Sequence, residues 1–326
     1  MLKKSLVLAV AVVAGVAFQA AAAPLVYVAA GSANEVIVID AATSTVVKSF
    51  PGVQNPHGIV ATPDGEYLIA GSIRETNVPN AKPNDPNSQL ALLHPEHGHV
   101  MASIPVVGMT HHQAITPGGR YVLSTHSTRG YVSVLDLQNN QIIQTIHTGP
   151  APNYTVIARD GKTAFVSNSG NNTISEIDLT TWRVRRTLDS GPAPEHMALS
   201  KDEKALYVVN PRAGTVSEVT VASGRVGRTF TLGQSLHGLD ISDDGSTLFV
   251  SSRKENKAIA LNPSTGETKT LPLAPSPYHL NTIAGTGKVY ISSSGTPKIW
   301  VVDQKTFALL GEIAIRGEGH QMAVVK

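Results

Sequence analysis

The stretch Thr163-Ala-Phe-Val-Ser-Asn168, followed by Asn172-Thr-Ile-Ser-Glu-Ile-Asp178, decides the fold of this chain. It returns 42 residues later as Ala205-Leu-Tyr-Val-Val-Asn210 and Gly214-Thr-Val-Ser-Glu-Val219. Each copy contains short apolar segments separated by turn residues and shows no helical periodicity, which indicates β-strands. A repeat of about 40–45 residues with four strands is typical of one blade of a β-propeller.

Histidine returns at one point of this repeat, where the first strand of each unit begins. The recurring residues are His57, the adjacent pair His111 and His112, His196, His237, His279 and His320. Two adjacent positions at each of seven strand starts make about fourteen positions. Because the chain has 12 histidines among 326 residues, chance would place about half a histidine at these positions, whereas seven are found. The first strand of each blade lines the central channel, so these side chains are expected to converge there. Convergent imidazoles favour a bound metal or cofactor over a structural ring of histidines.

The number of strand starts predicts how the propeller closes. They lie near residues 57, 111, 153, 196, 237, 279 and 320, and the one near 153 carries Asn153-Tyr154 instead of histidine. The last unit has only one strand before Lys326, while the N-terminal part supplies three, at 25–29, 35–40 and 45–50. We therefore predict an all-β, seven-bladed propeller closed by pairing the C-terminal strand with the N-terminal strands, which removes exposed sheet edges.

The first residues have the pattern of an export signal. Lys3 and Lys4 precede an apolar run and then small residues, which predicts a signal peptide over 1–22 and a single propeller domain over 23–326. The apolar run is too short for a membrane span. Removing both lysines lowers the formal net charge from +2 to about zero, which does not favour nucleic acid as a partner. We expect a periplasmic or secreted protein.

The chain has no cysteine, which excludes thiolate metal sites, iron–sulfur clusters and covalently attached c-type haem. A metal must therefore be bound by histidine, methionine, carboxylate or backbone groups. Met109, Met197 and Met322 lie within two residues of a recurring histidine. Thioether beside imidazole favours copper, although methionine is equally common as core filling.

Three other residues are candidates for cofactor binding. His126 aligns with the end of the second strand of its unit, on the same face as the recurring histidines. Glu195 and Asp240 lie close to recurring histidines, where a carboxylate could orient an imidazole or act as a general base. The sequence contains no nucleophile elbow, phosphate loop or zinc-protease motif, so the catalytic residues are unknown and an enzymatic role is left open.

A second histidine cluster, His94-Pro-Glu-His97-Gly-His99, aligns with a turn on the opposite face of the propeller. Three histidines on a tight turn can bind Zn²⁺ or Cu²⁺. A solvated polar turn is the interpretation that the sequence favours. The aspartates that recur at the ends of third strands are interpreted as structural residues that organise turns: Asp40, Asp136, Asp178 and Asp303.

The repeats resemble those of the YVTN-repeat (YncE-like) exported β-propellers. The resemblance is carried by Phe165–Asn168, Asn172–Asp178 and Pro63-Asp-Gly65, and it covers essentially the whole chain after the signal peptide. It implies the propeller fold and export, but it says little about function, because propellers host many activities.

The histidine ring also resembles the propeller of nitrous oxide reductase, in which hub histidines, including one adjacent pair, hold a multinuclear copper–sulfide cluster. His111 and His112 match the pair by residue type. That enzyme also needs a cupredoxin domain with cysteine ligands, and this sequence has none, so the resemblance implies copper binding but not nitrous oxide reduction. More distantly, the ring resembles the haem d1 propeller of cytochrome cd1 nitrite reductase, which implies a tetrapyrrole as an alternative cofactor.

The leading hypothesis from the sequence is a propeller that binds a transition metal, most readily copper, for metal handling or redox chemistry. One alternative is a non-enzymatic scaffold that holds a periplasmic protein or cell-envelope partner, and a second is a carrier of a haem d1-type tetrapyrrole. A metal ion or small ligand at the channel mouth is the expected partner. Because neutral imidazole binds metal, affinity is expected to fall below about pH 6.5, the ordinary histidine value.

Overall fold

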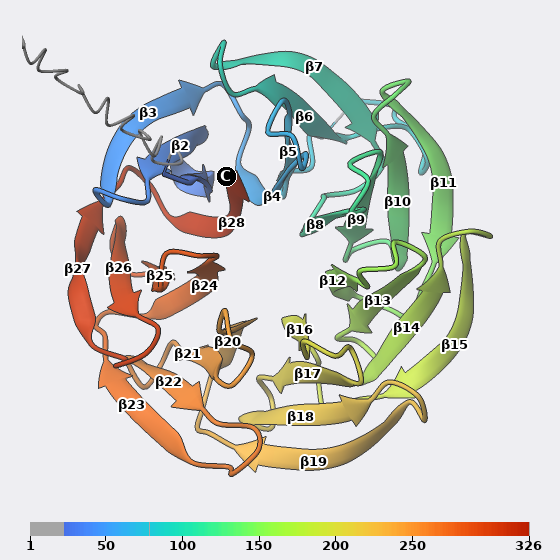
Figure 1. The fold of residues 1–326 in the computed structure, drawn as a ribbon. Coiled ribbons are helices and arrows are strands. Elements are labelled where there is room, and N and C mark those ends of the chain that lie inside the picture. Colours follow the sequence, from blue (N-terminus) through green and yellow to red (C-terminus); the bar gives the residue numbers. More distant parts are fainter. Residues whose placement is uncertain (1–22, 78, 326) are drawn as a thin grey trace, which may run out of the picture.

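Seven antiparallel sheets, each of four strands, surround one axis in the computed structural model, which describes residues 23–77 and 79–325 (Figure 1). The seven-bladed β-propeller that the repeats predict is thereby confirmed. The signal peptide predicted over 1–22 lies outside the described residues. Among the residues that are described, no helix is long and apolar enough to cross a membrane.

Six blades are each built from four consecutive strands, which follow one another from the axis outwards. The first three are β4 (Pro56–Ala61), β5 (Leu68–Ser72), β6 (Ser88–His94) and β7 (His99–Val106); β8 (Gln113–Ile115), β9 (Tyr121–His126), β10 (Tyr131–Asp136) and β11 (Gln141–His147); and β12 (Pro152–Ile157), β13 (Thr163–Asn168), β14 (Thr173–Asp178) and β15 (Arg183–Asp189). The next three are β16 (Met197–Leu199), β17 (Ala205–Asn210), β18 (Thr215–Thr220) and β19 (Arg225–Thr231); β20 (Leu236–Ile241), β21 (Leu248–Ser252), β22 (Lys257–Leu261) and β23 (Thr268–Pro272); and β24 (Pro277–Ile283), β25 (Lys288–Ser293), β26 (Lys298–Asp303) and β27 (Leu309–Ala314).

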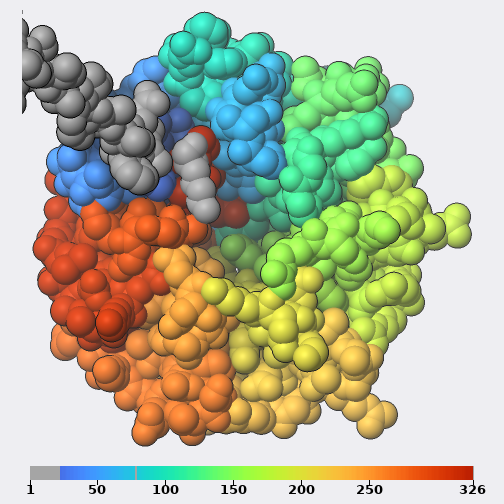
Figure 2. Space-filling model, viewed as in Figure 1, coloured from blue at the N-terminus to red at the C-terminus, as the bar shows by residue number. Residues whose placement is uncertain are grey.

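The seventh blade joins the two ends of the chain. Its order from the axis is β28 (Gly319–Val325), β1 (Leu25–Ala30), β2 (Glu35–Asp40) and β3 (Thr45–Pro51), with a short 3-10 turn over Gly31–Ala33. Tyr27 pairs with Ala323 across the junction. In the space-filling view the red C-terminal part lies directly against the blue N-terminal part (Figure 2). The predicted closure of the ring is therefore confirmed.

The apolar side chains are buried between neighbouring blades, and there is one hydrophobic cluster for each of the seven interfaces. The second and third strands of the blades are largely buried because both of their faces pack against another blade. Trp300, for example, is 1 % exposed and packs in one cluster with Phe249 and Phe307. Burial of such rings contributes about 1.5–3 kcal/mol each.

The aspartates at the ends of third strands organise the turns into fourth strands, as predicted. The Asp178 carboxylate accepts hydrogen bonds from the Thr180 and Thr181 amides at 2.8 and 3.2 Å. Asp303 accepts from the Lys305 and Thr306 amides at 3.0 and 2.7 Å. These bonds satisfy backbone donors that the turn leaves without strand partners.

Candidate metal centre

A β-bulge at the start of the innermost strand gives the site its unusual density of side chains. The amide of His111 donates to the Thr125 carbonyl, while the Thr125 amide donates to the His112 carbonyl, so two residues lie opposite one. Glu195 and His196 lie opposite Val209 in the same way. Register shifts occur at the corresponding point of β4, β12, β20 and β24. A bulge redirects side chains, so adjacent residues can both face the axis, which a regular strand would prevent.

The seven recurring histidines, which we call the hub histidines, converge on the axis as the sequence predicted. His279 lies at the centre of the group, with its ring centre 4.8–5.5 Å from those of five others, namely His57, His112, His196, His237 and His320. His111 joins the group through His57, at 4.4 Å, and through its neighbour His112, at 4.3 Å. All seven imidazoles therefore form one contiguous cluster.

Two pairs of nitrogen atoms in this cluster are each separated by a distance that suits an ion bound between them. His196 Nε2 is 3.2 Å from His279 Nδ1, and His237 Nε2 is 3.5 Å from His279 Nε2. Two nitrogens bound to one tetrahedral ion at about 2.0–2.1 Å lie roughly 3.4 Å apart. Four groups of three side chains bring one possible ligand atom each within 4.8 Å of one another. They are His57-His111-His112, His57-His279-His320, His112-His196-His279 and Glu195-His196-His237.

Many of the hub nitrogens are buried and lack a hydrogen-bond partner among the described residues. They are His57 Nδ1 and Nε2, His111 Nδ1, His112 Nε2, His196 Nδ1 and His320 Nδ1. A buried polar atom without a partner costs about 1–3 kcal/mol, so native proteins rarely retain several in one place. A neutral imidazole has one lone pair, so a metal ion would give a partner to one nitrogen of each ring.

The hub histidines are neutral at neutral pH. Burial lowers the pKa of His57, His112, His196, His237 and His279 well below the ordinary histidine value, and neighbouring imidazoles add to the effect at most of them. Burial also lowers the pKa values of the remaining two, bringing that of His320 to about 3. The loss of metal affinity at acid pH stays a prediction, and the lowered pKa values move its expected midpoint below pH 6.5.

Two contacts fix which nitrogen of an imidazole faces the cluster. Glu195 Oε2 lies 2.9 Å from His237 Nδ1, so that nitrogen carries the proton and Nε2 faces His279. His112 Nδ1 donates to the Asn153 carbonyl at 3.1 Å and leaves Nε2 free for a metal. Such outer contacts orient the imidazole and raise its basicity as a ligand. The predicted role of Glu195 in orienting a histidine agrees with this geometry.

Two tyrosines complete the wall of the cluster, and the sequence reasoning missed the second of them. Tyr154 fills the place that lacks a histidine, with its ring centre 4.9 Å from that of His112 and 4.6 Å from that of His196. Tyr278 stacks on His237 at 4.2 Å. Its only signal in the sequence is its place before His279, which matches the place of His111 before His112.

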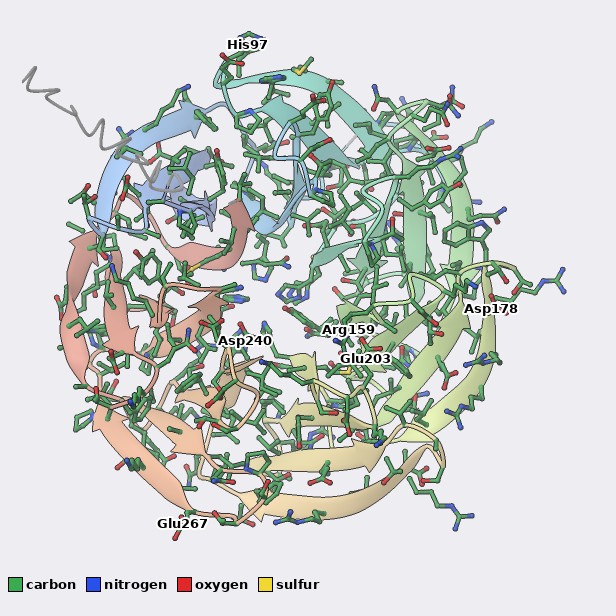
Figure 3. All side chains as sticks on the ribbon, viewed as in Figure 1. His97, Arg159, Asp178, Glu203, Asp240 and Glu267 are labelled. Atoms are coloured by element: carbon green, nitrogen blue, oxygen red, sulfur yellow. The ribbon has the colours of Figure 1, made fainter. Side chains whose placement is uncertain are left out.

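His126 and Asp240 lie apart from the groups of possible metal ligands. His126 Nε2 is 2.8 Å from Ser133 Oγ and Nδ1 is 3.3 Å from the Gly108 carbonyl, so both nitrogens are engaged within the fold. Asp240 accepts hydrogen bonds from the Thr282 and Ile241 amides at 2.7 and 2.8 Å, and burial raises its pKa to about 6. Figure 3 shows Asp240 close to the axis, further along β20 than His237.

The methionines do not support copper in the way that the sequence suggested. Met197 and Met322 are 2 and 4 % exposed and belong to hydrophobic clusters between blades. Met109 is half-buried, and its amide donates to Glu75. Met197 directly follows His196, and sequence neighbours on a strand point to opposite faces. Met322 is two residues from His320, and a register shift between Gly319 and Met322 turns its side chain into the core.

Several solved structures have the same fold. One is hydrazine synthase of Kuenenia stuttgartiensis, with 21 % sequence identity and a TM-score of 0.71, where the match covers 80 % of this chain and 86 % of the other. Another is the periplasmic gluconolactonase PpgL of Pseudomonas aeruginosa, with 17 % identity and a TM-score of 0.75, where the match covers 93 % of this chain and 99 % of the other. The dihydro-heme d1 dehydrogenase NirN in complex with DHE is also similar, with 16 % sequence identity and a TM-score of 0.68, and the match covers 91 % of this chain and 65 % of the other. At these identities the likeness concerns the fold alone.

Comparison by sequence gives one match to a protein family. No curated protein sequence matches this chain. Residues 131–247, which run from β10 into the turn before β21, match the sequence model of the YNCE-like beta-propeller. The resemblance carried by the repeats is thus confirmed, and over these residues the chain is similar to YNCE-like beta-propellers.

Proposed function

We propose that the hub histidines bind a transition metal, and that copper is the ion this donor set favours. The observation that carries the proposal is the group of six buried imidazole nitrogens that have no hydrogen-bond partner among the described residues. Each of these nitrogens belongs to a ring in contact with at least one other hub ring. Several lone pairs therefore converge on the same small space.

Copper is favoured by the chemistry of the donors. Imidazole suits copper, zinc, iron and nickel, and among divalent first-row ions the affinity of a given nitrogen site is highest for Cu²⁺. The lowered pKa values keep the imidazoles in the neutral form that binds metal. A periplasmic or secreted setting, as the signal sequence predicts, forms part of the proposal.

The surrounding residues would prepare the site for an ion. Glu195 holds His237 with Nε2 facing inwards, and the Asn153 carbonyl does the same for His112. Tyr154 and Tyr278 cover the sides of the cluster and limit the access of water. This setting suits storage or transfer of the metal, or a redox reaction at it.

The packing of the rings favours an ion over a tetrapyrrole. Neighbouring hub rings have centres 4.3–5.5 Å apart, so they contact one another directly. A haem d1-type macrocycle would have to separate several of them to enter the hub. A scaffold role needs no ligand at the hub, so the metal content of the protein separates it from the proposal.

Elemental analysis with an absorption spectrum, on protein matured in a bacterial periplasm, tests the proposal. We expect stoichiometric copper and weak visible absorption. A Soret band would instead identify a tetrapyrrole. Colourless, metal-free protein that also fails to take up Cu²⁺ or Zn²⁺ would refute metal binding and favour the scaffold.

Two variants locate the metal. Combined replacement of His111 and His237 by alanine should abolish the metal that the protein retains in the presence of a chelator, while the circular dichroism of the fold is kept. The matched control is His126→Asn, which alters a buried histidine outside the cluster. Asn168 and Asn210 occupy the equivalent position in other blades and donate to Ser175 and Ser217 at 3.0 and 2.8 Å. The control should therefore keep both fold and metal, and unchanged metal content in the double variant would refute the hub as the site.

A further inference from the structure

Three histidines lie together on the turn between β6 and β7, outside the hub. His94 ends β6, His99 begins β7, and the two are directly opposite each other in the strand register. The ring centre of His97, on the turn between them, lies 4.5 Å from that of His94 and 5.9 Å from that of His99. Two imidazoles on one ion have their ring centres roughly 5 Å apart when the metal–nitrogen bonds are about 2.0–2.1 Å.

The backbone of this turn is held in place. Gly98 has a φ of +68°, which glycine adopts without strain, and its amide donates to the His94 carbonyl at 2.9 Å. Lys48 of the neighbouring blade donates to the Pro95 and Glu96 carbonyls at 3.2 and 2.9 Å. The three imidazoles are thus presented on a fixed frame, which lowers the entropy cost of binding a ligand.

The side chains divide into one packed ring and two exposed ones. His94 is half-buried, and its ring lies edge-on to Tyr67 at 5.8 Å. Its Nδ1 is buried and has no hydrogen-bond partner among the described residues. The three rings do not bring one nitrogen each within 4.8 Å of one another in this structure. His97 and His99 are exposed, so both rings can rotate toward a common ion.

We propose that His94, His97 and His99 form a second site for a divalent transition-metal ion such as Zn²⁺ or Cu²⁺, independent of the hub. Water would complete the coordination, since the turn is open to solvent. The carboxylates of Asp64, Glu66 and Glu96 line the same groove as His94 and favour a cation there. The Lys48 ammonium repels a cation, but it donates hydrogen bonds to two backbone carbonyls.

The two sites are well separated. The hub histidines sit at the inner ends of six blades, whereas β6 and β7 are the third and fourth strands of their blade. Figure 3 shows His97 at the outer rim of the molecule and Asp240 beside the axis. Binding at the turn can therefore be measured while the hub is disabled.

The test is calorimetric titration of Zn²⁺ and Cu²⁺ into the double variant His111→Ala/His237→Ala and into the same protein with His97→Ala and His99→Ala added. We expect the first to bind one equivalent that a chelator removes readily, and the second to lose that equivalent. His147→Ala in the same background is the matched control, because His147 is an exposed histidine on β11 with no part in the turn. It should leave the equivalent unchanged.

Both replaced residues are exposed, so the variant is expected to fold, and circular dichroism checks this. Electron paramagnetic resonance of the Cu²⁺ form should show nitrogen ligands that disappear with His97 and His99. An unchanged stoichiometry on their removal, or no binding in the hub double variant, would overturn the turn site. Neither outcome bears on the hub, whose metal is measured in the otherwise wild-type protein.

Discussion

Lowering the pH should destabilise the metal-free protein far more steeply than an ordinary propeller. Burial lowers the pKa of every hub histidine in the folded chain, for example that of His320 to about 3. In the unfolded chain these groups titrate near 6.5. Below that value the unfolded chain binds more protons than the folded chain, so the free energy of unfolding falls as the pH falls.

The magnitude follows from the number of groups. A histidine that stays neutral in the folded chain costs about 1.4 kcal/mol of stability between pH 7.5 and 5.5. Seven such groups give an upper limit of about 10 kcal/mol. Asp240 has the opposite effect on stability. Its pKa is raised to about 6 in the folded chain, so the folded chain binds a proton at a higher pH than the unfolded chain does, which offsets the loss of stability by about 1 kcal/mol. The remaining loss is comparable with the whole stability of a typical domain, about 5–15 kcal/mol.

Denaturant unfolding at pH 7.5, 6.5 and 5.5, in the presence of a chelator and followed by circular dichroism, measures this loss. The variant His57→Asn removes one titrating group and should reduce the loss by about 1.4 kcal/mol. Metal-loaded protein should resist the same change of pH, because bound nitrogens are protected from protons. A free energy of unfolding that stays constant within about 1 kcal/mol from pH 7.5 to 5.5 would refute the reasoning, since the imidazoles would then be hydrated and titrate normally.

Three further tests by substitution address the geometry of the hub. His279→Ala should lower the metal content more than His111→Ala does, because the ring of His279 contacts five hub rings and the ring of His111 contacts two. Elemental analysis of both variants measures the difference, and equal losses would contradict the central place of His279. Glu195→Gln removes the carboxylate that orients His237 and should weaken copper binding by about 10–100-fold in a competition assay, and unchanged affinity would exclude this positioning role. Gly31→Ala places a methyl group 2.7 Å from His320 Nε2, so the ring must move. We expect reduced metal retention with a stable fold, and full retention would remove His320 from the ligands.

Most of the fold could be predicted from the sequence because the repeat carries it. One blade cannot bury its apolar strands alone, so a period such as that between Thr163 and Ala205 implies a ring of stacked units. The single strand after His320 and the three near the N-terminus then left one way to close the ring. The convergence of the histidines followed from the same periodicity, since equivalent positions in every blade lie at the axis.

The bulges and contacts that orient the hub side chains could not be predicted, because they depend on how residues far apart in the sequence meet in the folded chain. The bulges that let both His111 and His112 face the axis leave no clear pattern in the sequence. The contact between Glu195 and His237 joins neighbouring blades, and only the curvature of the ring brings them together. The methionines misled the reasoning, because proximity along a strand does not place a side chain on the same face.

The contrast between His126 and the hub histidines separates a structural role from a binding role within one protein. His126 is completely buried, and both of its nitrogens are within hydrogen-bond distance of protein atoms. The fold thus provides partners for a buried imidazole where that imidazole is structural. In the hub six nitrogens lack a partner among the described residues, so the fold itself does not provide partners for them. A ring inherited only from duplication would also hold one histidine in each blade, whereas one blade of this protein contributes two and the next contributes Tyr154. Both departures from a uniform ring favour a binding role of the hub over an inherited structural one.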